Sequence, residues 1–441
     1  MMSNTPAKDE LFVLRDEAGP ILYAPLQHLS ARINEAAVGT LSRRLYGKPL
    51  SEEDSAFLKQ LEDCGFFREA EIPRPQLDRT VQVTLFPTDG CNLRCRYCYA
   101  GAEKKRHILS AEAGKAAIDR VANRAKELGA DKFVVGFHGN GEPFHAFDLV
   151  RELCRYTREA SKRTGLKGAL TLATNGVMNE EQLDWLVTWF DGVNISFDGL
   201  EELQNRQRPM ADGSGSFPYV HRTLKRLNDE NKAFGIRTTV TASSVDRLPE
   251  IAAFVLENYP RCDPLHVEPS WEAGRSLKTG ERAPDPDVFI RKYLEADAIL
   301  DGKMRLVYSA SQLDHLGSGF CSVCGDSFVV TAEGLVSGCF EVAEMSDPRS
   351  ARFIYGAYDP GRKGFVFDEE KISGLHSLTV DRMPYCRDCF CKYHCCGDCA
   401  AKLLGLKPPE EHAGSDRCRI TRALTLHQIR KSLNEEEKNN A

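Results

Sequence analysis

The sequence has no uninterrupted run of about 18 apolar residues, the length that a membrane-spanning helix requires. Its N-terminal stretch lacks the apolar segment of a secretion signal. The net charge of −6 gives no sign of a basic surface for nucleic acid, and the chain has no internal repeat or low-complexity segment. These absences exclude membrane and nucleic-acid partners, and we expect a cytoplasmic globular protein with more than one domain.

Cysteine, by contrast, is abundant, with 16 in the 441 residues. Because the cytosol keeps thiols reduced, we expect these cysteines to ligate metal and not to form disulfides. Cys64, Cys154 and Cys262 fall in predicted helices or strands, and we expect them to be buried apolar thiols.

Three cysteines form a tight loop, Cys91, Cys95 and Cys98. An iron–sulfur cube needs four ligands, which cysteine thiolates normally supply. A CxxxCxxC loop supplies three, so one iron stays free to bind another molecule. A zinc site is the alternative, but zinc takes four protein ligands, often from CxxC pairs, and the nearest following histidine is His107. We call residues 91–98 the cysteine loop.

The middle of the chain alternates between strand and helix patterns. The predicted strands are Val81–Phe86, Lys132–Phe137, Gly168–Ala173, Val193–Phe197, Ile236–Thr241 and Leu265–Glu268. The predicted helices between them are Ser110–Leu128, Phe147–Thr164, Asn179–Trp189, Phe217–Lys232 and Leu248–Asn258. This alternation predicts an α/β fold of parallel units with right-handed crossovers, whose active-site residues gather at the C-terminal ends of the strands.

The cysteine loop resembles the CxxxCx-aromatic-C signature of the radical S-adenosylmethionine (SAM) superfamily, with Tyr97 in the aromatic position. The resemblance implies a partial (β/α)6 barrel over residues 80–304, a [4Fe-4S] cluster on the three cysteines, and SAM on its open iron. Other family motifs follow the predicted strands, where plain turns or a surface arginine are the alternatives. The SAM-binding residues that the resemblance implies are Tyr97, Gly141, Glu142, Pro143, Ser196, Asp198 and Arg208. Thr174-Asn175-Gly176, Glu268-Pro269 and Gly274-Arg275 resemble further family patterns.

Residues 305–420 are rich in glycine and cysteine, and their spacing resembles the SPASM domain of radical SAM peptide-modifying enzymes. The resemblance implies two auxiliary [4Fe-4S] clusters, three clusters in all. The implied ligands are Cys321, Cys324, Cys339 and Cys399 for the first, and Cys386, Cys389, Cys395 and Cys418 for the second. Cys321 is the least secure, and Cys391 and Cys396 compete as ligands. A zinc ribbon does not explain Cys399 or the Gly334–Cys339 spacing.

Residues 1–75 form a separate unit, with strands predicted at Leu11–Leu14 and Ile21–Tyr23 and helices at Asn34–Tyr46 and Ser51–Cys64. The unit resembles the winged-helix domains that recognise peptides ahead of many peptide-modifying enzymes. A capping extension of the barrel is the alternative. Residues 421–441 read as a C-terminal helix or tail.

The resemblance implies a maturase that takes hydrogen from a peptide by means of a 5′-deoxyadenosyl radical, and we favour crosslinking of a ribosomal precursor peptide. Anaerobic sulfatase maturation is the alternative, and a non-catalytic electron carrier is a distant one. A flavodoxin or ferredoxin is the implied electron donor. No catalytic acid or base is assigned. We call the cysteines of residues 305–420 the cysteine array. We expect most of the carboxylates near it to be solvated, those of Asp326, Glu333, Glu341 and Asp398, and we expect His394 not to be a ligand.

Overall fold

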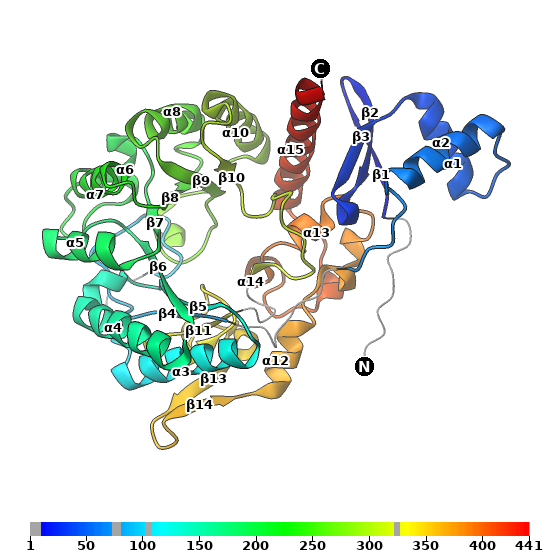
Figure 1. Ribbon diagram of the computed structural model, residues 1–441. Coiled ribbons are helices and arrows are strands. Elements are labelled where there is room, and N and C mark those ends of the chain that lie inside the picture. The colour runs from blue at the N-terminus through cyan, green and yellow to red at the C-terminus, as the bar shows by residue number, and fades with distance from the viewer. Residues whose placement is uncertain (1–9, 73–80, 102–106, 322–326, 441) are drawn as a thin grey trace.

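The computed structural model describes residues 10–72, 81–101, 107–321 and 327–440. Its largest feature is an 11-stranded sheet whose strands run in the order β10-β9-β8-β7-β6-β5-β4-β11-β12-β13-β14. The sheet is curved and carries helices on its outer face, while a smaller sheet lies beyond the C-terminal helix (Figure 1).

The barrel part of the sheet is parallel throughout. Its strands are β4 (Gln82–Leu85), β5 (Lys132–Phe137), β6 (Lys167–Thr174), β7 (Gly192–Ser196), β8 (Phe234–Val240), β9 (Cys262–Pro269) and β10 (Leu306–Val307). The apolar residues Val83, Val135 and Ile236 are fully buried, which explains why these short runs form strands. The predicted α/β barrel with six strands is confirmed, and a short seventh strand extends it. The barrel is open, because β4 pairs with β11 and not with β10.

Helices cover the outer face of the barrel. They are α3 (Ala111–Glu127), α4 (Phe147–Thr164), α5 (Glu180–Trp189), α6 (Glu201–Gln207), α7 (Phe217–Asp229), α8 (Leu248–Asn258) and α10 (Pro286–Leu300). The one-turn helix α9 (Ser276–Thr279) lies instead against the cysteine loop, where Thr279 Oγ1 donates to Arg96 O. The sequence-based assignment lacks α6, which is short and polar, and α10. The N-terminus of α10 is capped by Asp285, which accepts hydrogen bonds from two backbone N–H groups of the first turn.

The C-terminal region adds an antiparallel extension to the barrel sheet. It contains β11 (Ser327–Val330), β12 (Leu335–Ser337), β13 (Ile354–Asp359), β14 (Gly364–Phe367), α11 (Ser350–Phe353), α12 (Glu369–His376), α13 (Lys392–Cys395), α14 (Ala400–Leu403) and α15 (Asp416–Asn440). Strand β11 pairs in parallel with β4, and β12 to β14 follow as antiparallel neighbours. The predicted ligand Cys324 and the carboxylate of Asp326 lie outside the described residues.

The N-terminal unit has three strands, where two were predicted. They are β1 (Phe12–Asp16), β2 (Gly19–Ala24) and β3 (Leu29–Arg32), followed by α1 (Glu35–Leu45) and α2 (Glu52–Asp63). Strand β3 escaped prediction because its apolar alternation extends over only four residues, Leu29–Arg32. A capping box formed by Ser51 and Asp54 begins α2, as the string Ser51-Glu-Glu-Asp54 allows.

The N-terminal sheet packs against helix α15, and the two lie side by side in Figure 1. Ile21 and Tyr23 of β2 form one buried apolar cluster with Ile429 and Leu433 of α15. The N-terminal unit is therefore attached to the far end of the chain by apolar burial.

Two of the three expected buried thiols are buried, those of Cys154 and Cys262. The expectation for Cys64 is wrong, because this residue is exposed. It caps the C-terminus of α2 instead of facing the core of that unit.

We expect Ile21→Ala to weaken the attachment of the N-terminal sheet. Ile21 is completely buried, and removal of a large aliphatic side chain from such a site costs about 2–5 kcal/mol. Hydrogen exchange of the β2 amides should therefore become faster. Leu406→Ala, at a half-exposed position outside this cluster, is the matched control, and unchanged exchange in Ile21→Ala would contradict the assignment.

Candidate functional site

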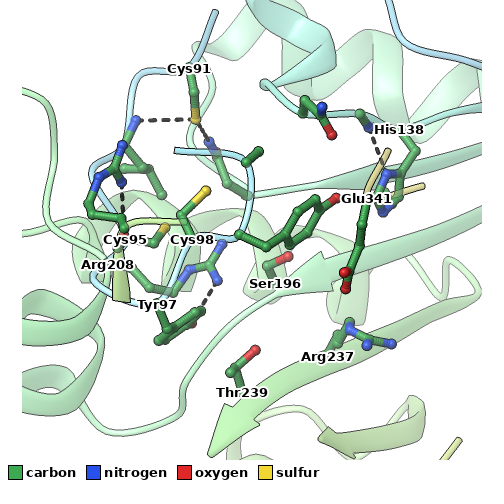
Figure 2. Close-up of a pocket in the computed structure, with 18 of the residues that line it drawn as sticks. Cys91, Cys95, Tyr97, Cys98, His138, Ser196, Arg208, Arg237, Thr239 and Glu341 are labelled. Carbon is green, nitrogen blue, oxygen red and sulfur yellow. Dashed lines mark hydrogen bonds between the residues drawn. The ribbon is translucent and has the colours of Figure 1, made fainter. Parts of the chain in front are cut away.

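A cavity of about 240 Å³ opens at the C-terminal ends of the barrel strands. Cysteine, glutamate and asparagine side chains from segments that follow different strands converge on it, as expected for a barrel of this kind. The predicted site residues that line it are Cys91, Cys95, Tyr97, Cys98, Gly141, Glu142, Ser196 and Arg208. Figure 2 shows this cavity with the cysteine loop on one side. Pro143 and Asp198 are not among the lining residues.

Backbone hydrogen bonds hold the cysteine loop from two sides. Arg94 N donates to Pro209 O at 2.7 Å, and Arg96 N donates to Gln207 O at 2.8 Å. On the other side, Arg275 donates from its backbone N to Cys98 O and from Nη1 to Cys95 O, both at 2.8 Å. The predicted Gly274-Arg275 pattern thus lies against the loop.

Glycine is required at position 274, which has a φ of +58°. A Cβ there would lie 2.2 Å from Tyr99 O and 2.5 Å from Cys98 O. The absent side chain therefore allows the segment after β9 to touch the cysteine loop directly.

Burial favours the protonated form of the Cys91 and Cys95 thiols when no metal is bound. Burial raises the pKa of Cys91 to about 11, and burial also raises the pKa of Cys95. Binding of a cluster would displace these protons. Among the described residues, no three His, Cys, Asp or Glu side chains converge on a position for a single metal ion. The three thiols share the wall of the larger cavity instead, which fits a cluster that leaves one iron open.

Glu142 lines the cavity, is nearly buried, and has hydrogen-bond donors at both carboxylate oxygens. Its Oε1 accepts from Thr174 Oγ1 at 2.6 Å, and its Oε2 accepts from Asn175 N at 2.7 Å. Burial raises the pKa of this carboxyl to about 6. The site therefore brings together two of the predicted motifs, with the Thr174-Asn175-Gly176 turn holding the acid in place.

Tyr97, Asp198 and Arg208 form a buried group beside the cysteine loop. Arg208 Nη1 donates to Tyr97 OH at 2.9 Å, and Tyr97 OH donates to Asp198 Oδ2 at 2.6 Å. The alternative of a surface arginine is wrong, since Arg208 is only 7% exposed. Asp198 also accepts from the backbone N of Thr239, a residue that lines the cavity. The Asp198 carboxylate itself is buried behind the cavity wall.

A second, smaller cavity is lined by Cys386, Cys389, Cys395 and Cys418, the four cysteines assigned to one auxiliary cluster. Cys391 lines the same cavity, with its Sγ 3.4 Å from that of Cys389. The competing thiol of Cys396 is directed elsewhere, because it donates to Tyr393 O. Five thiols therefore face this cavity, and the residues fit a four-cysteine cluster.

Two of the four cysteines assigned to the other auxiliary cluster, Cys339 and Cys399, lie next to the large cavity. Cys339 and Cys399 are close enough that, besides burial, a charge on Cys399 contributes to raising the pKa of Cys339. Glu341 and Lys402 follow these cysteines along the chain and line the large cavity, with Glu341 Oε1 3.1 Å from Lys402 Nζ. Cys321 is exposed.

The expectation that the carboxylates near the array are solvated is wrong for Asp398. It is 2% exposed and receives two hydrogen bonds from Arg417, at 2.6 and 3.1 Å. Nothing in the local sequence pairs Asp398 with Arg417, which lies 19 positions further on. Glu341 is also largely buried and ion-paired.

His394 is buried as well, and its two ring nitrogens have partners. Its Nδ1 donates to His315 O at 2.9 Å, and its Nε2 is hydrogen-bonded to Tyr23 OH of strand β2. The N-terminal sheet therefore touches the cysteine array directly. Sequence reasoning missed this contact, because its partners lie 371 positions apart.

Comparison with known sequences relates the barrel part of the chain to a family. Residues 85–254 match the model of the Radical SAM superfamily. Fe-coproporphyrin III synthase of Methanosarcina barkeri is 32% identical over 235 residues, which are 52% of this chain and 53% of that protein. A cysteine-type anaerobic sulfatase-maturating enzyme of Clostridium novyi is 24% identical over 57% of this chain and 71% of its own length. The chain thus spans about half the length of the first relative.

Comparison with solved structures supports the fold. Native anSMEcpe with bound AdoMet and the Kp18Cys peptide matches with a TM-score of 0.62 and 19% identity, over 80% of this chain and 99% of that chain. SuiB of Streptococcus suis bound to precursor peptide SuiA matches with a TM-score of 0.56 and 16% identity, over 93% of this chain and 99% of that chain.

No helix among the described residues is long and apolar enough to cross a membrane.

We expect Gly141→Ala to disrupt the large cavity. A Cβ at position 141 would lie 2.3 Å from Gly90 O and 2.7 Å from Thr88 O, so the backbone that leads into Cys91 must move. The affinity for SAM, measured by anaerobic equilibrium dialysis, should fall at least about tenfold. Gly192→Ala is the matched control, since its nearest atom is 3.8 Å away. Wild-type affinity in Gly141→Ala would refute the close approach.

Proposed function

We propose that this chain, a member of the radical SAM superfamily with a SPASM-type cysteine array, modifies a peptide by abstracting hydrogen from it. The observation that carries the proposal is the large cavity, where three thiols from one loop meet Glu142 and Ser196 from the ends of two barrel strands. A cavity with three thiols and a buried acid suits a cluster with one open iron and a bound ligand that carries an ammonium group.

Cys91, Cys95 and Cys98 would hold the first cluster, and SAM would complete it. When reduced, this pair supplies the 5′-deoxyadenosyl radical that removes hydrogen from an unreactive C–H bond. Glu142 would accept hydrogen bonds from the ammonium of SAM, and Ser196 and Asp198 would serve its ribose or its amino group. Arg208, which already orients Tyr97, would pair with the carboxylate of SAM. The remaining SAM contacts would come from Tyr97, Gly141 and Pro143.

The cysteines of the C-terminal region would hold two auxiliary clusters. Cys386, Cys389, Cys395 and Cys418, which share the smaller cavity, would hold one of them. Cys339 and Cys399, with Cys321 and Cys324, would hold the other. A flavodoxin or ferredoxin would deliver the electrons. Three clusters correspond to about twelve irons per chain.

A precursor peptide is the substrate that we favour. The N-terminal sheet is attached to α15 and touches the cysteine array through Tyr23, which suits a unit that presents a peptide to the barrel. SuiB, solved with its precursor peptide, matches 93% of this chain, whereas anSMEcpe matches 80%. Sulfatase maturation remains the alternative, because a sulfatase-maturating enzyme is among the sequence relatives.

The deciding experiment uses anaerobically reconstituted protein with dithionite as reductant. We expect about twelve irons per wild-type chain and the formation of 5′-deoxyadenosine from SAM. Replacement of Cys91, Cys95 and Cys98 by alanine should remove about a third of the iron and abolish SAM cleavage. The matched control is Cys154→Ala, at a buried cysteine in helix α4 that faces neither cavity.

Two outcomes would defeat the proposal. Iron without SAM cleavage in the wild type would leave the electron-carrier alternative, and zinc without sulfide would identify a zinc protein. The substrate is tested by co-expression with a short peptide or a sulfatase encoded beside this gene. Loss of two hydrogen atoms from the peptide supports crosslinking, whereas formylglycine in the sulfatase supports the alternative.

A further inference from the structure

Arg237 places a guanidinium group in the large cavity. It is the one exposed residue of strand β8, whose other residues are buried or partly buried, and its side chain lines the cavity. In Figure 2 the cysteine loop and Arg208 lie on one side, whereas Arg237 and Glu341 lie on the other. The cavity thus carries one arginine beside the cysteines and another well away from them.

A chain of buried groups orients Arg237. Its Nη1 donates to His266 Nδ1 at 3.2 Å, and His266 Nε2 donates to Glu268 Oε1 at 3.0 Å. Burial lowers the pKa of His266, so the imidazole is neutral and can accept from the guanidinium. His266 thereby holds one nitrogen of the Arg237 guanidinium, and the other N–H groups of the guanidinium are left for the cavity.

Glu268 makes no direct contact with Arg237, although the charge of Arg237 contributes to lowering the pKa of this carboxyl. Its Oε1 also accepts from Ser309 N at 2.9 Å, and its Oε2 lies 3.5 Å from Arg417 Nη1. Among the described residues, no carboxylate forms an ion pair with Arg237, and its hydrogen-bond partner is the neutral His266. Burial lowers the pKa of the neighbouring His138 to about 4, with a contribution from Arg237, so that ring is neutral and is not a counter-ion for the guanidinium.

On the same side of the cavity as Arg237 (Figure 2), Glu341 is already paired. It lies between Lys402 Nζ at 3.1 Å and Arg349 Nη1 at 3.5 Å. The end of the cavity away from the cysteine loop therefore holds a preoriented guanidinium that no carboxylate in the described part of the chain contacts directly. Such a group binds carboxylates through paired N–H donors, and binding is stronger where water is displaced.

We propose that Arg237 binds a carboxylate of the peptide substrate and so selects peptides with an acidic group beside the reacting residue. This inference rests on the proposed function, because it requires a substrate in the cavity. The carboxylate can belong to an Asp or Glu side chain or to a peptide C-terminus. Arg208, beside the cysteine loop, is left for the carboxylate of SAM.

The test measures how fast phenylglyoxal modifies Arg237 in reconstituted, SAM-saturated wild-type protein, by mass spectrometry of the digested chain. N-acetylglutamate α-amide should slow the modification about threefold at saturation, whereas its isostere N-acetylglutamine α-amide should have no effect. N-acetylalanine presents a terminal carboxylate instead, and protection by this probe alone would assign the site to a peptide C-terminus. Arg362, whose side chain is 74% exposed, is the internal control.

Absence of protection by either carboxylate would overturn the proposal. So would complete protection by SAM alone, because Arg237 would then belong to the SAM site. As a second measurement, Arg237→Gln should bind SAM with wild-type affinity in equilibrium dialysis, and a loss of about tenfold or more would contradict the assignment. Reductive SAM cleavage by the wild type is measured in parallel, so a failure of the proposed function is seen separately from a failure at Arg237.

Discussion

The backbone contacts that hold the cysteine loop are the constraint on which the rest of the site depends. A loop of eight residues cannot by itself direct three thiols to one point. Its backbone N–H and C=O groups need hydrogen-bond partners elsewhere in the chain to hold the loop in one conformation. Here the segment before Pro209 holds it on one side, and Gly274 with Arg275 holds it on the other. Both supports follow barrel strands, so the parallel sheet determines where the thiols face.

Buried carboxylates are the second feature that shapes the site. Glu142, Asp198 and Asp398 are nearly inaccessible, and each is held by several hydrogen-bond donors. A buried carboxylate without such partners would cost several kcal/mol. Donors from distant segments therefore hydrogen-bond to the buried carboxylates around the two cavities. These bonds hold polar groups at fixed positions where a substrate would meet them.

The N-terminal unit and the cysteine array are one connected structure. Strand β2 packs on α15 through apolar residues and reaches His394 through Tyr23. Lys392 of the array also pairs with Glu10 at 2.5 Å. A peptide bound to the N-terminal sheet would consequently lie on a support that is continuous with the proposed auxiliary clusters.

The sequence by itself determined the α/β barrel, the cysteine loop and the smaller cysteine-lined cavity. These depend on short spacings and on repeated strand patterns, which act locally. Only the tertiary structure decided that Asp398 is buried against Arg417, that Cys391 joins the second cavity, and that no carboxylate among the residues described forms an ion pair with Arg237. A strand pattern says which side of the sheet a residue faces, but its charge partners come from segments far along the chain, which only folding brings together.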